Sequence, residues 1–305
     1  MIDLWTNTIP EEDRPEVFLL GRNVYIESLA GMGPVMTTEI LDIITRSEGY
    51  LPVNKEDLVV AACDSLYAQK YIPEFVLSHA ENDVPVHIHI DAMDLDTFFL
   101  MLRLYELVPE DLLTISYTLL ENKRNTHRGS NRPLKTSWHA YYTCIRFFIA
   151  EKLLETNKSI VICDADFLLT HKYKYPDYDV SLAFNENFGD HNHTRSIWAG
   201  VMRIKNSVLG KIFLNLLCEK LEVKYQQINS YKWSTDQQCL YEVWKEIGGE
   251  IGNIFKGNQH FYMSINDGEM DARSPYFSPK RNHRWFTNTP WYGRIAEYRQ
   301  LLYKV

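Results

Sequence analysis

The chain is poor in cysteine, and its cysteines are not arranged in close pairs. Its 305 residues include five, none with Cys-x-x-Cys spacing: Cys63, Cys144, Cys163, Cys218 and Cys239. Each lies within or beside an apolar segment, and an odd number cannot all pair within one chain. The pattern predicts buried, reduced thiols and argues against a disulfide-stabilised fold.

Long apolar runs are also missing. No stretch reaches the length of about 18 apolar residues that a membrane-spanning helix requires. The first residues, MIDLWTNTIPEEDRPEVF, lack the basic region and apolar core of a signal peptide. We therefore expect a cytoplasmic protein with no transmembrane segment.

The chain lacks an excess of positive charge as well. Lys and Arg number 32 and Asp and Glu number 40, which gives a net charge of −8. Nucleic acids and anionic lipid surfaces are bound by basic patches, so neither is expected as a partner. A phosphate-bearing substrate is still compatible with this net negative charge, because a bound metal ion supplies positive charge locally.

The composition is otherwise that of a globular protein, 45% hydrophobic and 24% charged. From residue 57 onward, short apolar runs alternate with segments of helical spacing, which predicts βαβ units and an α/β fold with a mostly parallel sheet. Residues 1–56 lack this pattern and are interpreted as an N-terminal appendage, with a helix at 37–47. Residues 57–305 are interpreted as the main domain.

The predicted elements follow one another regularly. The expected strands are 58–63, 84–90, 112–117, 159–163, 178–184 and 198–204, and the expected helices are 66–79, 95–107, 138–155, 206–222 and 236–247. Residues 253–265 indicate strand and turn, and residues 273–291, rich in Pro, Asn and aromatics, indicate an ordered loop.

The strongest chemical signal is SIVICDADFLL at residues 159–169. A short apolar run predicts a buried strand that ends at Asp164-Ala165-Asp166. Strand alternation would place both carboxylates on one side, with Ala165 facing away. Two carboxylates there suit Mg²⁺ or Mn²⁺, which often share their ligands with substrate phosphates. The alternative is a solvated turn in which Asp bonds its own backbone.

The order of several motifs resembles a known family. A βαβ nucleotide-binding half is followed by CIRFFIAEKLL, ICDADFLL, AGVMRIKNS and STDQQCLYEVW. This order resembles the GT-A-fold nucleotide-sugar glycosyltransferases, nearest to the glycogenin-like and nucleotide-diphospho-sugar transferase groups, over residues 58–291. The resemblance implies a Rossmann-like GT-A fold. It also implies an enzyme that moves a sugar from a nucleotide-diphosphate sugar, with UDP-sugar favoured, to a glycan, lipid-linked or protein acceptor.

The resemblance further implies a Mn²⁺ or Mg²⁺ cofactor. Asp164 and Asp166 would bind the ion, which bridges the two donor phosphates. The physical reason is that a Lewis acid stabilises the negative charge that develops on the leaving diphosphate.

A third metal ligand is implied late in the chain. His283 stands before Pro290 with the spacing of glycogenin-like enzymes, and His260 is the alternative. The motif departs from the family at Phe286 and Thr289, where the family has Gly and Lys. The family's diphosphate-binding Lys is therefore in doubt, and its candidate substitutes are Lys280, Arg281 and Arg284.

Three residues are expected in the catalytic centre, where the resemblance places Arg146 near the nucleotide or the metal-binding carboxylates. Arg146 interrupts an apolar helix face, where a buried guanidinium needs an acidic or phosphate partner; the alternative is an Arg that reaches solvent. The resemblance places Asp236 and Gln237 at the donor sugar and acceptor, although Asp236 can also be a simple helix start. Asp236 would act as a base if the reaction inverts, but the resemblance favours retention.

The nucleotide is expected at the end of the first regular strand. The resemblance implies that Ala62, Cys63 and Asp64 meet the base and ribose and that Tyr67 stacks on the base, whereas Asp64 can also act as a helix N-cap. A Gly inside a strand often marks close approach by a ligand. The remaining residues expected at the donor are Asp164, Ala165 and Gly200. Asn185 and Glu186, which follow the strand at 178–184, are further candidates for contacts with the sugar hydroxyls.

Two other functions compete with sugar transfer. A sugar-nucleotide pyrophosphorylase carries a Gly-rich, basic loop near its first strand, but ACDSLYAQ has neither Gly nor a basic residue before Lys70. A non-catalytic nucleotide-sugar-binding module is disfavoured because Asp164, Asp166 and Asp236 are all present.

Overall fold

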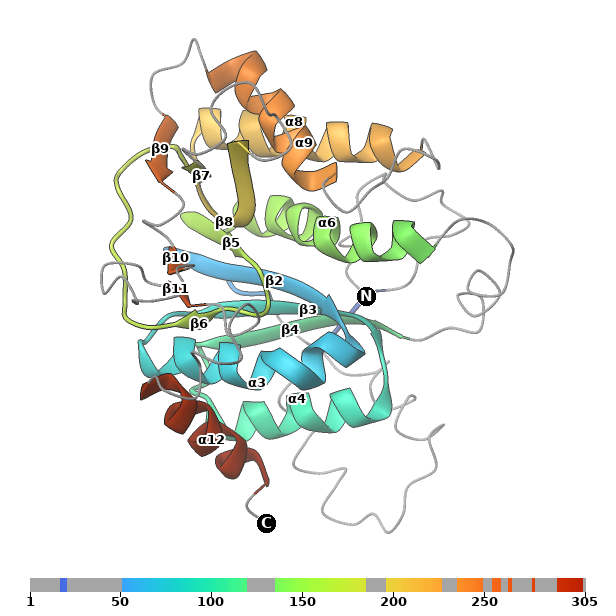
Figure 1. Cartoon of the computed structure of the whole chain (residues 1–305), viewed down its shortest axis with the longest axis vertical. Coiled ribbons are helices and arrows are strands. Elements are labelled where there is room, and N and C mark those ends of the chain that lie inside the picture. The colour runs from blue at the N-terminus through green and yellow to red at the C-terminus, as the bar shows by residue number, and fades with distance from the viewer. Residues whose placement is uncertain are drawn as a thin grey trace.

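The computed structural model describes residues 17–20, 51–119, 135–184, 196–226, 235–248, 254–258, 263–264, 276–277 and 290–303. Within these residues the centre is an eight-stranded sheet in the order β1-β4-β3-β2-β5-β8-β7-β9 (Figure 1). Its strands are β1 (Val17–Leu19), β2 (Leu58–Asp64), β3 (Val86–Met93), β4 (Leu113–Leu119), β5 (Ser159–Cys163), β7 (Val180–Phe184), β8 (Ile197–Lys205) and β9 (Ile254–Asn258).

The middle of the sheet is parallel. β2 pairs in parallel with both β3 and β5, and β3 pairs in parallel with β4. β5 reads SIVIC and is buried along its whole length, because helices cover both faces of such a sheet. The carboxyl ends of parallel strands lie at one edge, so Asp64 and Asp164 come to the same edge, where open α/β sheets bind ligands.

One side of the sheet changes direction. β8 runs antiparallel to β5, β7 runs antiparallel to β8, and β9 runs parallel to β7, while β1 adds an antiparallel edge next to β4. The sheet is therefore mixed but mostly parallel, which confirms the predicted α/β class. Because β8 begins where β5 ends, Gly200 of β8 meets the chain that leaves β5.

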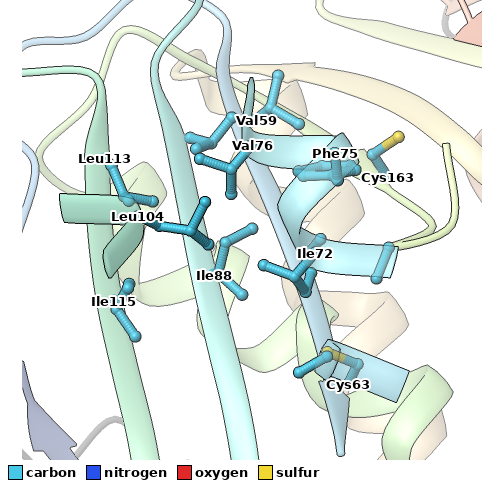
Figure 2. Packing of buried hydrophobic residues seen from close by; sticks show 14 of the residues in the cluster. Val59, Cys63, Ile72, Phe75, Val76, Ile88, Leu104, Leu113, Ile115 and Cys163 are labelled. Carbon is cyan, nitrogen blue, oxygen red and sulfur yellow. The ribbon is translucent and has the colours of Figure 1, made fainter. Parts of the chain in front are cut away.

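Helices form a layer on each face of the sheet (Figure 1). α3 (Ser65–Glu81), α4 (Leu95–Leu107) and α12 (Pro290–Tyr303) lie on one face, and α6 (Lys135–Leu154), α8 (Val208–Gln226) and α9 (Thr235–Val243) lie on the other. Each layer encloses its own hydrophobic cluster. Figure 2 shows part of the first cluster, with Ile72 and Phe75 of α3 beside Val59 and Ile88 of the sheet.

Two helices begin at aspartates that follow strands. The side chain of Asp64 accepts a hydrogen bond from the Tyr67 backbone N–H at 2.8 Å, and Asp94 does the same for Thr97 at 2.8 Å. Both are N-caps, which satisfy backbone donors that the first helical turn leaves unpaired. The capping interpretation of Asp64 is therefore confirmed.

The last helix, α12, packs on α3 through ion pairs. Arg299 Nε lies 2.5 Å from Oε1 of Glu74, whose side chain is only 5% exposed. Arg294 pairs with Glu81 near the end of α3. These contacts join two segments that are more than 200 residues apart in sequence.

The predicted bounds agree with most of the observed elements. The helix at 95–107 and the strand at 159–163 have the bounds that the structure gives. The predicted helix at 236–247 is α9 followed by a π-helical turn, Trp244–Gly248. The ordered loop predicted for 273–291 is wrong in part, because β11 (Tyr276–Phe277) and the start of α12 fall within it. The predicted helix at 37–47 lies outside the described residues.

A smaller sheet joins three short strands that lie far apart in sequence. β6 (Leu168–Leu169) pairs antiparallel with β11, and β10 (Met263–Ser264) pairs parallel with β11. β6 follows the two carboxylates directly, so this sheet fixes the chain as it leaves them. Tyr276 of β11 is buried, and its hydroxyl lies 3.0 Å from that of Tyr175.

Two further expectations bear on the whole chain. All five cysteines are buried and free, as their spacing predicts. Among the helices in the described part of the chain, none is both long and apolar enough to cross a membrane.

Candidate active site

The candidate site lies where β5 ends. Asp164 directly follows β5, and its backbone N–H donates to the carbonyl of Gly200 at 2.9 Å. Ala165 and Asp166 lie in a turn and not in a continued strand. The strand alternation expected for the two carboxylates therefore does not hold, and their directions are set by the turn and by separate neighbours.

Arg146 is the centre of the buried charges here. Its guanidinium pairs with Oδ1 of Asp164, donates to the Ala199 carbonyl at 2.9 Å and lies 3.5 Å from Oδ2 of Asp236. The Arg146 side chain is 4% exposed, so it does not reach solvent. A buried cation needs such acidic partners, because burial without them is very costly. We call Arg146, Asp164 and Asp236 the arginine–carboxylate group.

α6 presents Arg146 from a buried segment. Residues 144–150 of this helix are all buried, and Arg146 is the charged residue among them. The guanidinium also lies 5.1 Å from the ring centre of Phe147. Its Nε atom is buried and has no hydrogen-bond partner within the described residues. Burial alone would lower the pKa of Arg146, but Asp164 and Asp236 raise it, so this side chain stays charged.

Asp236 stands in the first turn of α9 and is 6% exposed. Its Oδ1 atom accepts a hydrogen bond from the Gln237 backbone N–H at 2.8 Å. Burial raises the pKa of Asp236 to about 6, even though the Arg146 cation opposes this shift. The neighbouring Gln237 side chain is half-buried and makes no hydrogen bond with the rest of the described chain. One carboxylate and one amide therefore stand side by side at this helix start.

The two aspartates of the Asp-x-Asp motif have different surroundings. Asp164 is 32% exposed and bound to Arg146 of α6, whereas Asp166 is 7% exposed and interacts with Tyr67 of α3. Burial, followed by the nearby Asp166 carboxylate, raises the pKa of the Tyr67 hydroxyl, which therefore stays protonated. α6 and α3 cover opposite faces of the sheet (Figure 1). The two aspartates of the motif therefore contact helices on opposite faces, at the edge of the sheet.

The predicted nucleotide corner lies at the end of β2. Asp64 and Ala62 are half-buried, but Cys63 is 3% exposed and belongs to the first hydrophobic cluster. Burial raises the pKa of the Cys63 thiol well above its usual value. Cys63 can therefore meet a ligand through its backbone, whereas Asp64 and Tyr67 still present polar side-chain atoms near the edge.

Gly200 has close neighbours. A Cβ added to it would lie 2.7 Å and 2.8 Å from two indole atoms of Trp198 and 3.1 Å from Oδ2 of Asp164. Any larger residue would displace the indole. The structure therefore adds Trp198, which has no assigned role in the sequence analysis, to the neighbours of Asp164. The sequence does contain a signal for this contact, because Trp198 stands two positions before Gly200 in a strand. Residues two positions apart in a strand lie on the same face of the sheet.

A metal ion would find oxygen ligands at this edge. The carboxylates that fit are Asp166 and the second oxygen of Asp164, Oδ2, because Arg146 holds the first. No group of three or more His, Cys, Asp or Glu side chains that could hold a metal occurs among the described residues. The other candidate residues lie outside them: His283, His260, Lys280, Arg281, Arg284, Asn185, Glu186, Phe286 and Thr289.

Comparison with known proteins addresses the fold. No protein-family model matches the chain, and no curated protein does. Among solved structures, the galactosyltransferase LgtC in complex with donor and acceptor sugar analogs is similar, with a TM-score of 0.50 and 13% identity over 82% of this chain and 97% of LgtC. An active-site mutant of LgtC gives a TM-score of 0.51 and 14% identity over the same shares of the two chains. The chain therefore has the GT-A glycosyltransferase fold that its motifs predicted.

Proposed function

We propose that this chain is a glycosyltransferase that moves a sugar from a nucleotide-diphosphate sugar, with UDP-sugar favoured, to a hydroxyl of a glycan, lipid-linked or protein acceptor. The observation that carries the proposal is the buried arginine–carboxylate group at the carboxyl edge of the sheet. Buried charges with a shifted pKa are frequent at functional sites, and ligands of such sheets bind at this edge. The similarity of the fold to LgtC supports the same class.

A bound Mn²⁺ or Mg²⁺ ion belongs to this proposal. Asp166 and Oδ2 of Asp164 would be its ligands in the described chain, and His283, or else His260, would supply a third. When bound, the ion offsets the negative charge that develops on the leaving diphosphate. Arg146 contributes by fixing Asp164, so that one carboxylate oxygen stays turned away from the guanidinium.

The state of Asp236 favours a retaining transfer. An inverting enzyme needs a carboxylate that accepts the proton of the acceptor hydroxyl. Asp236 is 6% exposed, and it is tied to Arg146 and to the Gln237 backbone. A carboxylate held in this way is poorly placed to meet an incoming acceptor. Its role in the proposal is to hold Arg146, while the neighbouring Gln237 amide, which is half-buried, binds donor hydroxyls.

The five buried free thiols support a reducing compartment such as the cytoplasm for this activity. Two of them lie on sheet strands and three on the helices α6, α8 and α9, and all are buried, so oxidation would require the fold to open. This part of the proposal concerns location alone.

A thermal-shift screen tests the function directly. UDP, GDP, CMP and their sugars are each added with Mn²⁺ or with EDTA, since a ligand that binds only the folded state raises the melting temperature. We expect a shift with UDP and its sugars that requires the metal. Asp166→Asn should remove the metal-dependent shift and lower the turnover of the UDP-sugar by on the order of 100-fold or more.

The matched control is Asp177→Asn, which alters a side chain that is 84% exposed and paired with Lys205. It should behave as wild type in both assays. Metal-stimulated hydrolysis of the sugar nucleotide would separate an enzyme from a binding module. The absence of a shift with every nucleotide and metal would contradict the proposal.

A further inference from the structure

The residue whose surroundings the proposed reaction leaves unexplained is Trp198. It stands on β8, two positions before Gly200, and is half-buried. Its indole lies over Gly200, where two of its ring atoms leave no room for a Cβ. The absence of a side chain at Gly200 therefore lets a large aromatic ring lie close to the backbone beside Asp164.

A second ring also contacts the indole. The ring of Phe167 lies 5.6 Å from that of Trp198, inclined at 47°, and Phe167 itself is 2% exposed. The backbone of β8 at Gly200 and the buried ring of Phe167 thus both restrict the indole. An aromatic ring held in this way loses little conformational entropy when a ligand rests on it, which favours binding.

The polar atoms around the indole are not used up by the protein. The Trp198 indole N–H has no hydrogen-bond partner within the described residues, and neither has Oδ2 of Asp164. A flat apolar surface with a few donors and acceptors around it suits a sugar ring, which has C–H groups on its faces and hydroxyls on its rim.

We propose that the Trp198 indole is the surface on which the sugar of the donor rests, and that it selects donors whose pyranose ring presents a C–H face. The proposal rests on the proposed function, since it assigns the sugar part of that same site. The nucleotide part lies by contrast at Asp64 and Tyr67, at the end of β2. Trp198 is therefore a specificity residue for the sugar and has no part in binding the nucleotide.

The test compares UDP with UDP-sugars. Isothermal titration with Mn²⁺ measures the affinity of UDP, UDP-glucose, UDP-galactose and UDP-xylose for wild type, Trp198→Ala and Trp198→Phe. We expect Trp198→Ala to weaken the UDP-sugars by about three- to tenfold, the range of one aromatic contact, and to leave UDP within about twofold of wild type. Trp198→Phe keeps a ring and should show a smaller loss.

The control is Trp244→Phe, which alters a tryptophan that is 6% exposed and packed on Phe184 and Tyr241. It should leave the ratio of UDP to UDP-sugar affinity unchanged. Equal weakening of UDP and UDP-sugars by Trp198→Ala, or no weakening of either, would overturn the inference. If UDP does not bind the wild type at all, the UDP-sugar part of the proposed function fails, and this outcome is distinct from the other two.

Discussion

Two buried arginines stand near opposite ends of the β5–β8 strand pair, and their surroundings differ. Arg203 of β8 is 5% exposed and pairs with Val161 in the middle of β5, and its side chain binds Asp57 near the start of β5. Its Nε donates to Oδ1 of Asp57 at 2.6 Å, and Nη1 lies 3.3 Å from the Tyr178 carbonyl. Ser159 donates to the same Asp57 oxygen at 2.8 Å. All of these partners belong to the protein itself, so we interpret Arg203 as a structural residue.

The arginine–carboxylate group at the other end is less complete. Arg146 Nε has no hydrogen-bond partner among the described residues, Asp164 keeps an unpaired oxygen there, and the pKa of Asp236 is raised to about 6. Groups that a protein uses only for stability are normally satisfied. The comparison teaches that burial of an arginine does not reveal its role, whereas the completeness of its hydrogen bonding does.

The largest expected effect comes from removing each arginine in turn. Arg203→Met should lower the free energy of unfolding by about 2–4 kcal/mol, because it leaves Asp57 and two carbonyls without their partner. Arg146→Met should cost less, about 1–2 kcal/mol, because Asp164 reaches water and Asp236 can take up a proton. Urea unfolding near neutral pH measures both values.

Activity should reverse the order of the two variants. UDP-sugar turnover of Arg146→Met should fall by on the order of 100-fold, while Arg203→Met should stay near wild type below its melting temperature. A larger stability loss for Arg146→Met than for Arg203→Met would break the comparison.

The next effect concerns the pH dependence of stability. Asp236 has a pKa of about 6 in the fold against a usual 3.8, so the folded state binds this proton more tightly than the unfolded chain does. Its contribution to stability is fully present below about pH 4 and is lost as the pH rises through about 6. The loss is on the order of 2–3 kcal/mol.

Asp236→Asn removes this titration. The stability of the variant relative to wild type should therefore improve by about 1.4 kcal/mol between about pH 5 and pH 7.5, as measured by urea unfolding. Asp177→Asn serves as a control, because Lys205 lowers the pKa of Asp177 and so places its titration below this window. A pH-independent difference between Asp236→Asn and wild type would contradict the raised pKa.

The smallest effect compares two glycines. Gly200→Ala brings a methyl group within 2.7 Å of the Trp198 ring, whereas the same change at Gly293 of α12 meets nothing within 4 Å. We expect Gly200→Ala to destabilise by about 1–2 kcal/mol through overpacking. Gly293→Ala should stabilise by about 0.5–1 kcal/mol through helix propensity. Thermal unfolding distinguishes the two, and equal effects would show that the indole moves aside without cost.

The sequence predicted the parallel half of the sheet well. The strands at Leu58–Asp64 and Ser159–Cys163 are short apolar runs, and the helices after Asp64 and Asp94 begin with N-caps. Local pattern and final structure agree there, because both faces of each strand are buried. The smaller sheet was not predicted, since strands of two residues carry no period that a sequence can show.

The sequence predicted which residues form the candidate site, but it did not predict how their side chains are arranged. The motifs placed Arg146, Asp164 and Asp236 in one site, and their contacts are the ones that a buried arginine requires. The direction of Asp166 depends on a turn, and the position of the Trp198 ring depends on a glycine two residues away. Such features follow from tertiary packing, so the spacing of residues along the chain cannot give them.

The ion pair between α3 and α12 has a consequence for synthesis. Glu74 leaves the ribosome 225 residues before Arg299, which becomes its partner. At rates of about 5–20 residues per second, the growing chain spends roughly 10–45 seconds with this carboxylate unpaired. During that time Glu74 must stay hydrated or protonated, so the outer face of α3 stays exposed to solvent. This face of α3 is therefore buried only when α12 packs on it.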